Sequence, residues 1–270
     1  MDQERRTQIE AALQQYRETV LQHSLFLLHK LVEGVEAEPT PPGLPEENAD
    51  FLRVREIGRH LQGISKSIKL PRAVLNDDFL SSLIEPARLD GVSHYPVNLA
   101  LRERYFAGVR THIEALNVEV AEFPPADLDY LCTLISGVTG PGLPFHREVR
   151  QFDFITPIED ENLEEMMAAV EVPIRNGGED YNNLTFIWED WEIIVAFKLG
   201  GGPRGWGGSW ALYCRKEDND EWKWRYGLHD EDWCSDVYNS VGEFLGFYAH
   251  FREQTEEELR KHIRGIEKLR

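Results

Sequence analysis

The residue types that could carry chemistry in this chain gather in its last third. His229, Asp230, Glu231 and Asp232 are consecutive and lie between two stretches rich in aromatic residues. Adjacent residues seldom converge on one metal ion without a ligand from elsewhere, and the sequence contains neither an HExxH nor a paired CxxC motif. We therefore interpret this segment as a solvated acidic turn and predict no metal site. A hydrolase using His229 and its acidic neighbours is the catalytic alternative.

A glycine-rich stretch from Gly200 to Gly208 is the most unusual local feature of the sequence. A phosphate-binding loop exposes backbone N–H groups at the start of a helix and carries a Lys-Ser or Lys-Thr pair. This stretch has no such pair and lies between predicted strands, so we expect no nucleotide and no other cofactor. It presents Arg204 and Trp206, which we predict to contact a partner. A structural connection packed by Trp206 is an equal alternative.

The tryptophans are confined to residues 188–233. Large amphipathic rings supply much of the binding energy at protein interfaces, but a sheet covered by helices also needs bulky aromatic residues inside. We expect most of these rings in the core, and we expect Trp206 and Trp233, in predicted loops, to be exposed. The predicted partner-binding residues are Arg204, Trp206, Asp230, Glu231, Asp232 and Trp233.

The charge balance restricts the class of partner. The chain has 29 Lys and Arg against 48 Asp and Glu, a formal net charge of −19. Such a field repels phosphate backbones and anionic lipid, and the sequence shows no concentrated basic face. We expect no nucleic acid partner and favour proteins with a basic surface. The acidic segment 159–165 either docks such a partner or is simply a solvated helix start, where the helix dipole favours carboxylates.

Cysteine usage and hydropathy bear on location. Cys132, Cys214 and Cys234 form an odd, widely spaced trio, which predicts free thiols and no disulfide framework. The first residues lack the apolar core of a signal peptide, and the longest apolar runs are too short to span a bilayer. We expect a cytoplasmic protein without membrane insertion, with the nucleus also possible, and leave its oligomeric state open.

Apolar periodicity predicts helices through the first 118 residues. Apolar residues at helical spacing predict a first helix that Gly34 ends, and a second from about Val54 to Pro71. A short helix is expected to start at Asn76, and a long one near Pro96.

The later sequence predicts short helices and antiparallel strands. A short helix from 126 closes at Gly137, and a strand at 152–158 and a helix at 161–169 follow. Strands are expected at 184–188, 191–199, 209–215 and 222–226, joined by short polar turns or by the glycine stretch. Capping sequences at Ser240 and Thr255 predict two last helices, the second with Leu259, Ile263, Ile266 and Leu269 on its apolar face.

The predicted fold class is therefore α+β, an antiparallel sheet flanked by helices and preceded by a helical N-terminal region. We predict a helical region at 1–118, an α+β domain at 119–252 and a C-terminal helix at 253–270.

Residues 124–251 resemble the SMI1/KNR4 family of the SUKH superfamily. The family opens on a short helix after a proline, which matches Pro124 to Tyr130 running to Gly137. A sheet bearing glycine and tryptophan follows, and the segment from Ser240 to Leu245 is similar to the family's closing S-F-x-E-F-L helix. The chain departs from the pattern at Phe123, which replaces the opening leucine, and the first 118 residues lie outside the resemblance.

The resemblance implies a compact α+β domain that binds proteins. Bacterial members of the family are similar to immunity proteins that neutralise toxins, and fungal members act as regulatory scaffolds in cell-wall and morphogenesis signalling. We expect a non-catalytic interaction module of the scaffold kind. The alternatives are an immunity-type toxin neutraliser, a hydrolase near His229 and the glycine stretch, and a structural subunit that assembles through its N-terminal helices. A tight, buried cluster of hydrogen-bonded titratable side chains beneath the hairpins would contradict the non-catalytic expectation.

Overall fold

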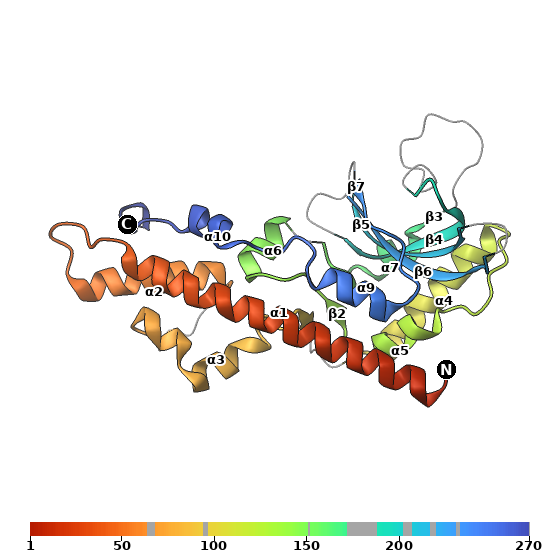
Figure 1. Cartoon of the computed structure of the whole chain (residues 1–270), viewed down its shortest axis with the longest axis horizontal. Helices are drawn as coiled ribbons and strands as arrows, with labels where there is room; N and C mark the ends of the chain where they lie inside the picture. Colours follow the sequence, from red (N-terminus) through yellow and green to blue (C-terminus); the bar gives the residue numbers. More distant parts are fainter. Residues whose placement is uncertain are drawn as a thin grey trace. The chain divides into compact units, whose positions relative to one another are not determined.

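The computed structural model describes residues 1–63, 68–93, 97–150, 152–171, 188–201, 207–216, 220–230 and 233–269. Its fold is α+β, as the sequence predicts, with helices and an antiparallel sheet (Figure 1). Contacts group the chain into two compact units, each built from three segments. Unit 1 contains residues 1–15, 93–139 and 152–248, and unit 2 contains residues 16–92, 140–151 and 249–270. The predicted boundaries at 118 and 252 stay a prediction.

A five-stranded antiparallel sheet is the centre of unit 1. Its strands follow one another in the order of the chain, so each pairs with the next. The sheet buries most of β5 and β6, in keeping with their dense apolar and aromatic side chains. The strands are β3 (Val170–Glu171), β4 (Glu192–Gly201), β5 (Gly208–Arg215), β6 (Lys223–Asp230) and β7 (Trp233–Cys234).

Three of the predicted strands are confirmed, and β6 runs four residues further than predicted, to Asp230. Residues 184–187 of another predicted strand lie outside the described part of the chain. The predicted strand at 152–158 is wrong, because only Ile155 forms a bridge there, with Val138. This segment divides its hydrogen bonds: the amide of Phe154 donates to Val138, whereas that of Thr156 donates to Leu199 at the end of β4.

Helices and a two-stranded sheet complete unit 1. The helix α4 begins at Leu99, three residues after the predicted start at Pro96, and the amide of Leu101 donates to the side chain of its N-cap residue, Asn98. The helices are α4 (Leu99–Ala115), α5 (Ala126–Leu134), α7 (Leu163–Ala168) and α9 (Val241–Tyr248), and the small sheet pairs β1 (Val92–Ser93) with β2 (Gly137–Val138).

The first helix, α1 (Gln3–Ala37), contributes residues to both units. The prediction that Gly34 ends it is wrong, because the helix continues to Ala37. A Cβ on Gly34 would lie 2.5 Å from the Cδ1 atom of Ile263. The glycine therefore serves a close helix contact inside unit 2, which a local pattern does not distinguish from a stop signal.

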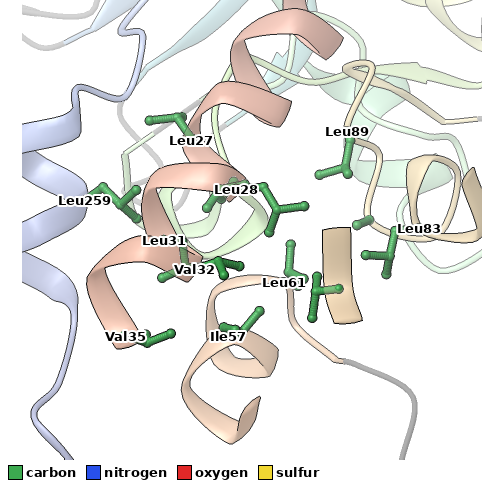
Figure 2. Close-up of a cluster of buried hydrophobic side chains, with 13 residues drawn as sticks. Leu27, Leu28, Leu31, Val32, Val35, Ile57, Leu61, Leu83, Leu89 and Leu259 are labelled. Carbon is green, nitrogen blue, oxygen red and sulfur yellow. The ribbon is translucent and has the colours of Figure 1, made fainter. Parts of the chain in front are cut away.

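Unit 2 packs short helices around the second part of α1. Figure 2 shows its core, in which Leu27, Leu28 and Leu31 of α1 lie beside Ile57 of α2 and Leu259 of α10. The remaining elements of this unit are α2 (Glu46–His60), η1 (Pro71–Leu75), α3 (Asp77–Ile84), α6 (Pro144–Arg150), α10 (Glu256–His262) and η2 (Ile266–Leu269).

Two predicted helix ends in unit 2 are wrong. The second helix ends at His60 rather than near Pro71, because Gln62 is left-handed (φ 56°) and the amide of Gly63 donates to the carbonyl of Gly58. The last helix begins with the predicted capping box at Thr255 but ends at His262. The apolar residues that follow belong to η2 and pack on another cluster, with Ala49 and Leu52.

Candidate functional site

A stack of three aromatic side chains lies at one edge of the sheet in unit 1. Trp233 on β7 is 46% exposed, and its ring centroid is 6.5 Å from that of Phe247, with an interplanar angle of 24°. Phe247 stacks in turn on Tyr238, at 5.0 Å and 23°. We call Trp233, Tyr238 and Phe247 the aromatic surface. Phe247 and Tyr238 are half-buried, so the stack presents apolar area to solvent.

Backbone hydrogen bonds hold these rings in place. In the edge ladder, Trp233 pairs with Asp230 of β6. Tyr238 and Tyr226 exchange both backbone hydrogen bonds, at 2.8 and 2.9 Å. At the start of α9, which carries Phe247, the amide of Glu243 donates to the hydroxyl of Ser240 at 3.2 Å, as the capping pattern predicts. The stack is therefore positioned by regular structure, which limits the entropy lost on binding.

Two carboxylates lie beside the aromatic surface. Asp230 is opposite Trp233 in the ladder, and the exposed Asp236 is close enough for its charge to act on Tyr238. Burial and the charge of Asp236 raise the pKa of Tyr238 to about 12. A flat aromatic face beside carboxylates attracts a cationic side chain through both the ring quadrupole and the local negative potential.

The structure brings two of the predicted partner-binding residues together, Asp230 and Trp233. Arg204, Trp206, Glu231 and Asp232 lie outside the described residues. Sequence reasoning missed Tyr238 and Phe247, although Phe247 lies off the apolar stripe of its helix. An aromatic residue on the polar side of a helix is the signal that was available.

The other tryptophans divide between core and surface. Trp188, Trp210 and Trp224 are buried, whereas Trp191 and Trp222 are half-buried. His229, the residue of the catalytic alternative, is half-buried on β6 and pairs with Gly208 and Cys234. Among the described residues, no group of three His, Cys, Asp or Glu side chains is arranged to hold a metal ion.

A buried pair of titratable side chains does lie beneath the hairpins. The hydroxyl of Tyr226 donates to Asp127 at 2.6 Å, and both residues are almost fully buried. Asp127 also accepts from the amides of Val241, at 3.0 Å, and of Leu128, at 3.0 Å. The Asp127 carboxylate on α5 is thus hydrogen-bonded to β6, through Tyr226, and to the start of α9, through Val241. We assign this pair a bracing role, because its hydrogen bonds join three elements of the fold.

Unit 2 contains a second buried polar cluster, on α2. Arg59 donates two hydrogen bonds to Glu56, at 2.6 and 3.1 Å. Its guanidinium carbon also lies over the ring of Phe145, 4.4 Å from the ring centroid, in a cation–π contact. Nε2 of His60 lies 2.9 Å from a guanidinium nitrogen of Arg59 and 3.5 Å from the Glu56 carboxylate. Burial and the charge of Arg59 lower the pKa of His60. Burial opposes ionisation of Glu56, but contacts with His60, Arg59 and the Arg264 amide outweigh it and lower its pKa to about 2.

Comparison with known proteins identifies no relative: no family model, no curated protein and no solved structure matches this chain. None of the helices in the described ranges is long and apolar enough to cross a membrane.

Proposed function

We propose that this chain is a non-catalytic protein-interaction module that binds a partner with a basic surface. The observation that carries the proposal is the exposure of Trp233, 46%, within a rigid stack flanked by carboxylates. Aromatic rings of this kind are typical anchors of protein interfaces, and acidic neighbours steer and orient a cationic partner. The formal net charge of −19 adds a long-range attraction for the same basic partner.

The finer proposal is a regulatory or scaffold protein of the SMI1/KNR4 type. The element order of unit 1 supports it, because α5 follows a pair of prolines, the tryptophan-bearing hairpins come next and α9 closes the segment. The free thiols Cys132, Cys214 and Cys234 suit a cytoplasmic or nuclear location. An immunity-type protein is the second candidate, since the same acidic surface would complement a basic toxin.

A peptide selection tests the binding mode without a known partner. Random 12-residue peptides would be selected on the immobilised full chain. We expect the enriched peptides to be basic, and their affinity to fall when salt is raised from low to high concentration. Trp233→Ala should weaken them by about 2 kcal/mol, roughly 30-fold.

The matched control is Trp222→Ala. Trp222 is also half-buried in unit 1, but it stacks on Tyr213, with centroids 6.0 Å apart, away from the aromatic surface. Peptide affinity should be unchanged in this variant. Enrichment of acidic peptides, or equal binding to the Trp233→Ala and wild-type chains, would rule the proposed surface out.

A further inference from the structure

A second candidate site in unit 1 is a cavity of about 350 Å³. It lies between the end of β4 and α7, whereas the aromatic surface is at the edge strand β7. Its volume falls within the range of small-molecule sites. The lining residues are Asp153, Thr156, Asn162, Glu165, Met166, Ala169, Lys198, Gly200 and Gly201.

The two ends of the glycine stretch make room for Lys198. A Cβ on Gly208 would lie 2.5 Å from Cε of this lysine, and one on Gly201 would lie 3.6 Å from it. A Cβ on Gly200 would lie 2.1 Å from the carbonyl oxygen of Asp153. Close packing therefore requires glycine at positions 200 and 208, where a larger residue would displace the backbone or the lysine side chain, whereas a Cβ on Gly201 would make an ordinary contact with Lys198.

Three charged groups line the cavity, and the Asp153 carboxylate already accepts from the Thr156 hydroxyl at 3.4 Å, which leaves Lys198 and Glu165 for a ligand. Within the described chain, neither the Lys198 ammonium nor the Glu165 carboxylate has a hydrogen bond or an ion pair, although Lys198 is half-buried. Burial lowers the pKa of Lys198, and the nearby charges of Glu171 and Glu165 oppose that effect without contacting the ammonium. A half-buried ammonium without a close partner gains from an anionic group in the cavity.

The other polar groups of the lining already have partners. Thr156 accepts from the amide of Gly201 at 3.2 Å. The side chain of Asn162 accepts from the amide of Glu159 and donates to the carbonyl of Pro157, both at 2.9 Å. Ligand recognition therefore falls to one ammonium and one carboxylate, with Met166 and Ala169 as the apolar wall.

We infer that this cavity binds a small zwitterion, namely an α-amino acid with an apolar side chain. Its carboxylate would meet Lys198, its ammonium would meet Glu165, and its side chain would cover Met166. A simple anion suits the cavity less well, because Asp153 and Glu165 outnumber the one lysine in the lining. This binding activity goes beyond the proposed partner binding and does not depend on it.

Calorimetric titration of the full chain with leucine, methionine and phenylalanine tests the inference. We expect at least one to bind with a Kd of about 1 mM or tighter. The matched analogues of leucine are 4-methylpentanoate, which lacks the ammonium, and 3-methylbutylamine, which lacks the carboxylate. Each should bind at least about 10-fold more weakly than leucine, because one charged contact is missing.

Two variants locate the site. Lys198→Met should weaken amino-acid binding at least about 10-fold, and Glu165→Gln should weaken it without changing the affinity for 4-methylpentanoate. Glu165 is exposed on α7, so its variant is expected to fold even if Lys198→Met does not. Lys223→Met, at an exposed position of β6, is the control and should bind as the wild type does.

Three outcomes would overturn the inference. The first is that none of the amino acids binds at 10 mM, about ten times the expected Kd. The second is equal binding to the wild type and to both site variants. The third is 4-methylpentanoate binding as tightly as leucine, which would indicate a carboxylate site. Loss of peptide binding in Trp233→Ala leaves this inference standing, because Trp233 is on β7 and the cavity is beside β4.

Discussion

Removing the hydroxyl of Tyr226 tests whether the buried Tyr226–Asp127 pair is a brace of unit 1. In Tyr226→Phe the ring and its packing stay, and only the 2.6 Å hydrogen bond to Asp127 is lost. A hydrogen bond to a charged group contributes about 1.5–3 kcal/mol, so we expect unit 1 to lose about 2 kcal/mol of unfolding free energy. Burial and the adjacent Asp127 charge raise the pKa of Tyr226, so the hydroxyl is the donor at neutral pH.

The carboxylate is expected to matter more than the hydroxyl. Asp127→Ala leaves the Tyr226 hydroxyl and the amides of Val241 and Leu128 without their acceptor, and adds a small cavity. Each unsatisfied buried donor costs roughly 1–3 kcal/mol, which gives an expected loss of about 4 kcal/mol or more. In a double-mutant cycle the coupling between the two side chains should be about 2 kcal/mol.

Tryptophan fluorescence during urea unfolding reports unit 1 selectively, because all seven tryptophans lie between residues 188 and 233. The matched control is Tyr130→Phe, which removes a tyrosine hydroxyl that donates to Glu10 at the surface of the same unit. Its urea midpoint should stay close to that of the wild type. If Tyr226→Phe shifts the midpoint no more than Tyr130→Phe does, the pair is not a brace and our interpretation of the cluster fails.

Two further predictions concern acid and glycine. Folding lowers the pKa of His60 from 6.5 and that of Glu56 from 4.5 to about 2, so folded unit 2 binds fewer protons than unfolded unit 2. The stability of unit 2 should therefore fall below pH 6.5, and fall further from pH 4.5 towards 2. Unfolding followed by far-UV circular dichroism at each pH measures this dependence. Glu56→Gln should remove the lower part of this pH dependence, and an unchanged profile would contradict the assignment. Gly200→Ala should destabilise unit 1 by about 2 kcal/mol or more, because its Cβ would lie 2.1 Å from the Asp153 carbonyl oxygen. Gly246→Ala, which has open space around it in α9, should instead stabilise unit 1 by about 0.5–1 kcal/mol. Similar urea midpoints for the two variants would refute the packing argument.

Sequence patterns predict elements where the deciding interactions are local. The α+β class, the strands β4 to β6 and the capping of α10 at Thr255 follow from alternation, turn residues and a capping box. Sequence patterns fail where a distant residue determines the local structure. Gly34 lies inside α1 because it packs against Ile263, which is more than two hundred positions away in the sequence. The segment at 152–158 fails likewise, because its backbone pairs with two different neighbours.

The candidate sites show the same limit. The exposure of Trp233 is predictable from its place among polar residues, but its stacking on Phe247 depends on how α9 packs beside β7. In the sequence, Lys198 is an ordinary polar residue between the apolar residues Phe197 and Leu199 of a strand. Its isolation in a cavity becomes visible only once Glu165, Gly201 and Gly208 are placed around it. Asp127 resembles a helix-start carboxylate in sequence, and its partners lie about a hundred residues further along.

The division of each unit into three separate chain segments has a consequence for biosynthesis. A ribosome must release residues up to 248 before unit 1 has all its parts, and the segment 249–270 before unit 2 has them. Neither unit can therefore finish folding while the chain is still being extended through the region of the hairpins. The nascent chain exposes unfinished apolar surfaces until these segments have emerged, so newly made copies should be frequent clients of ribosome-associated chaperones.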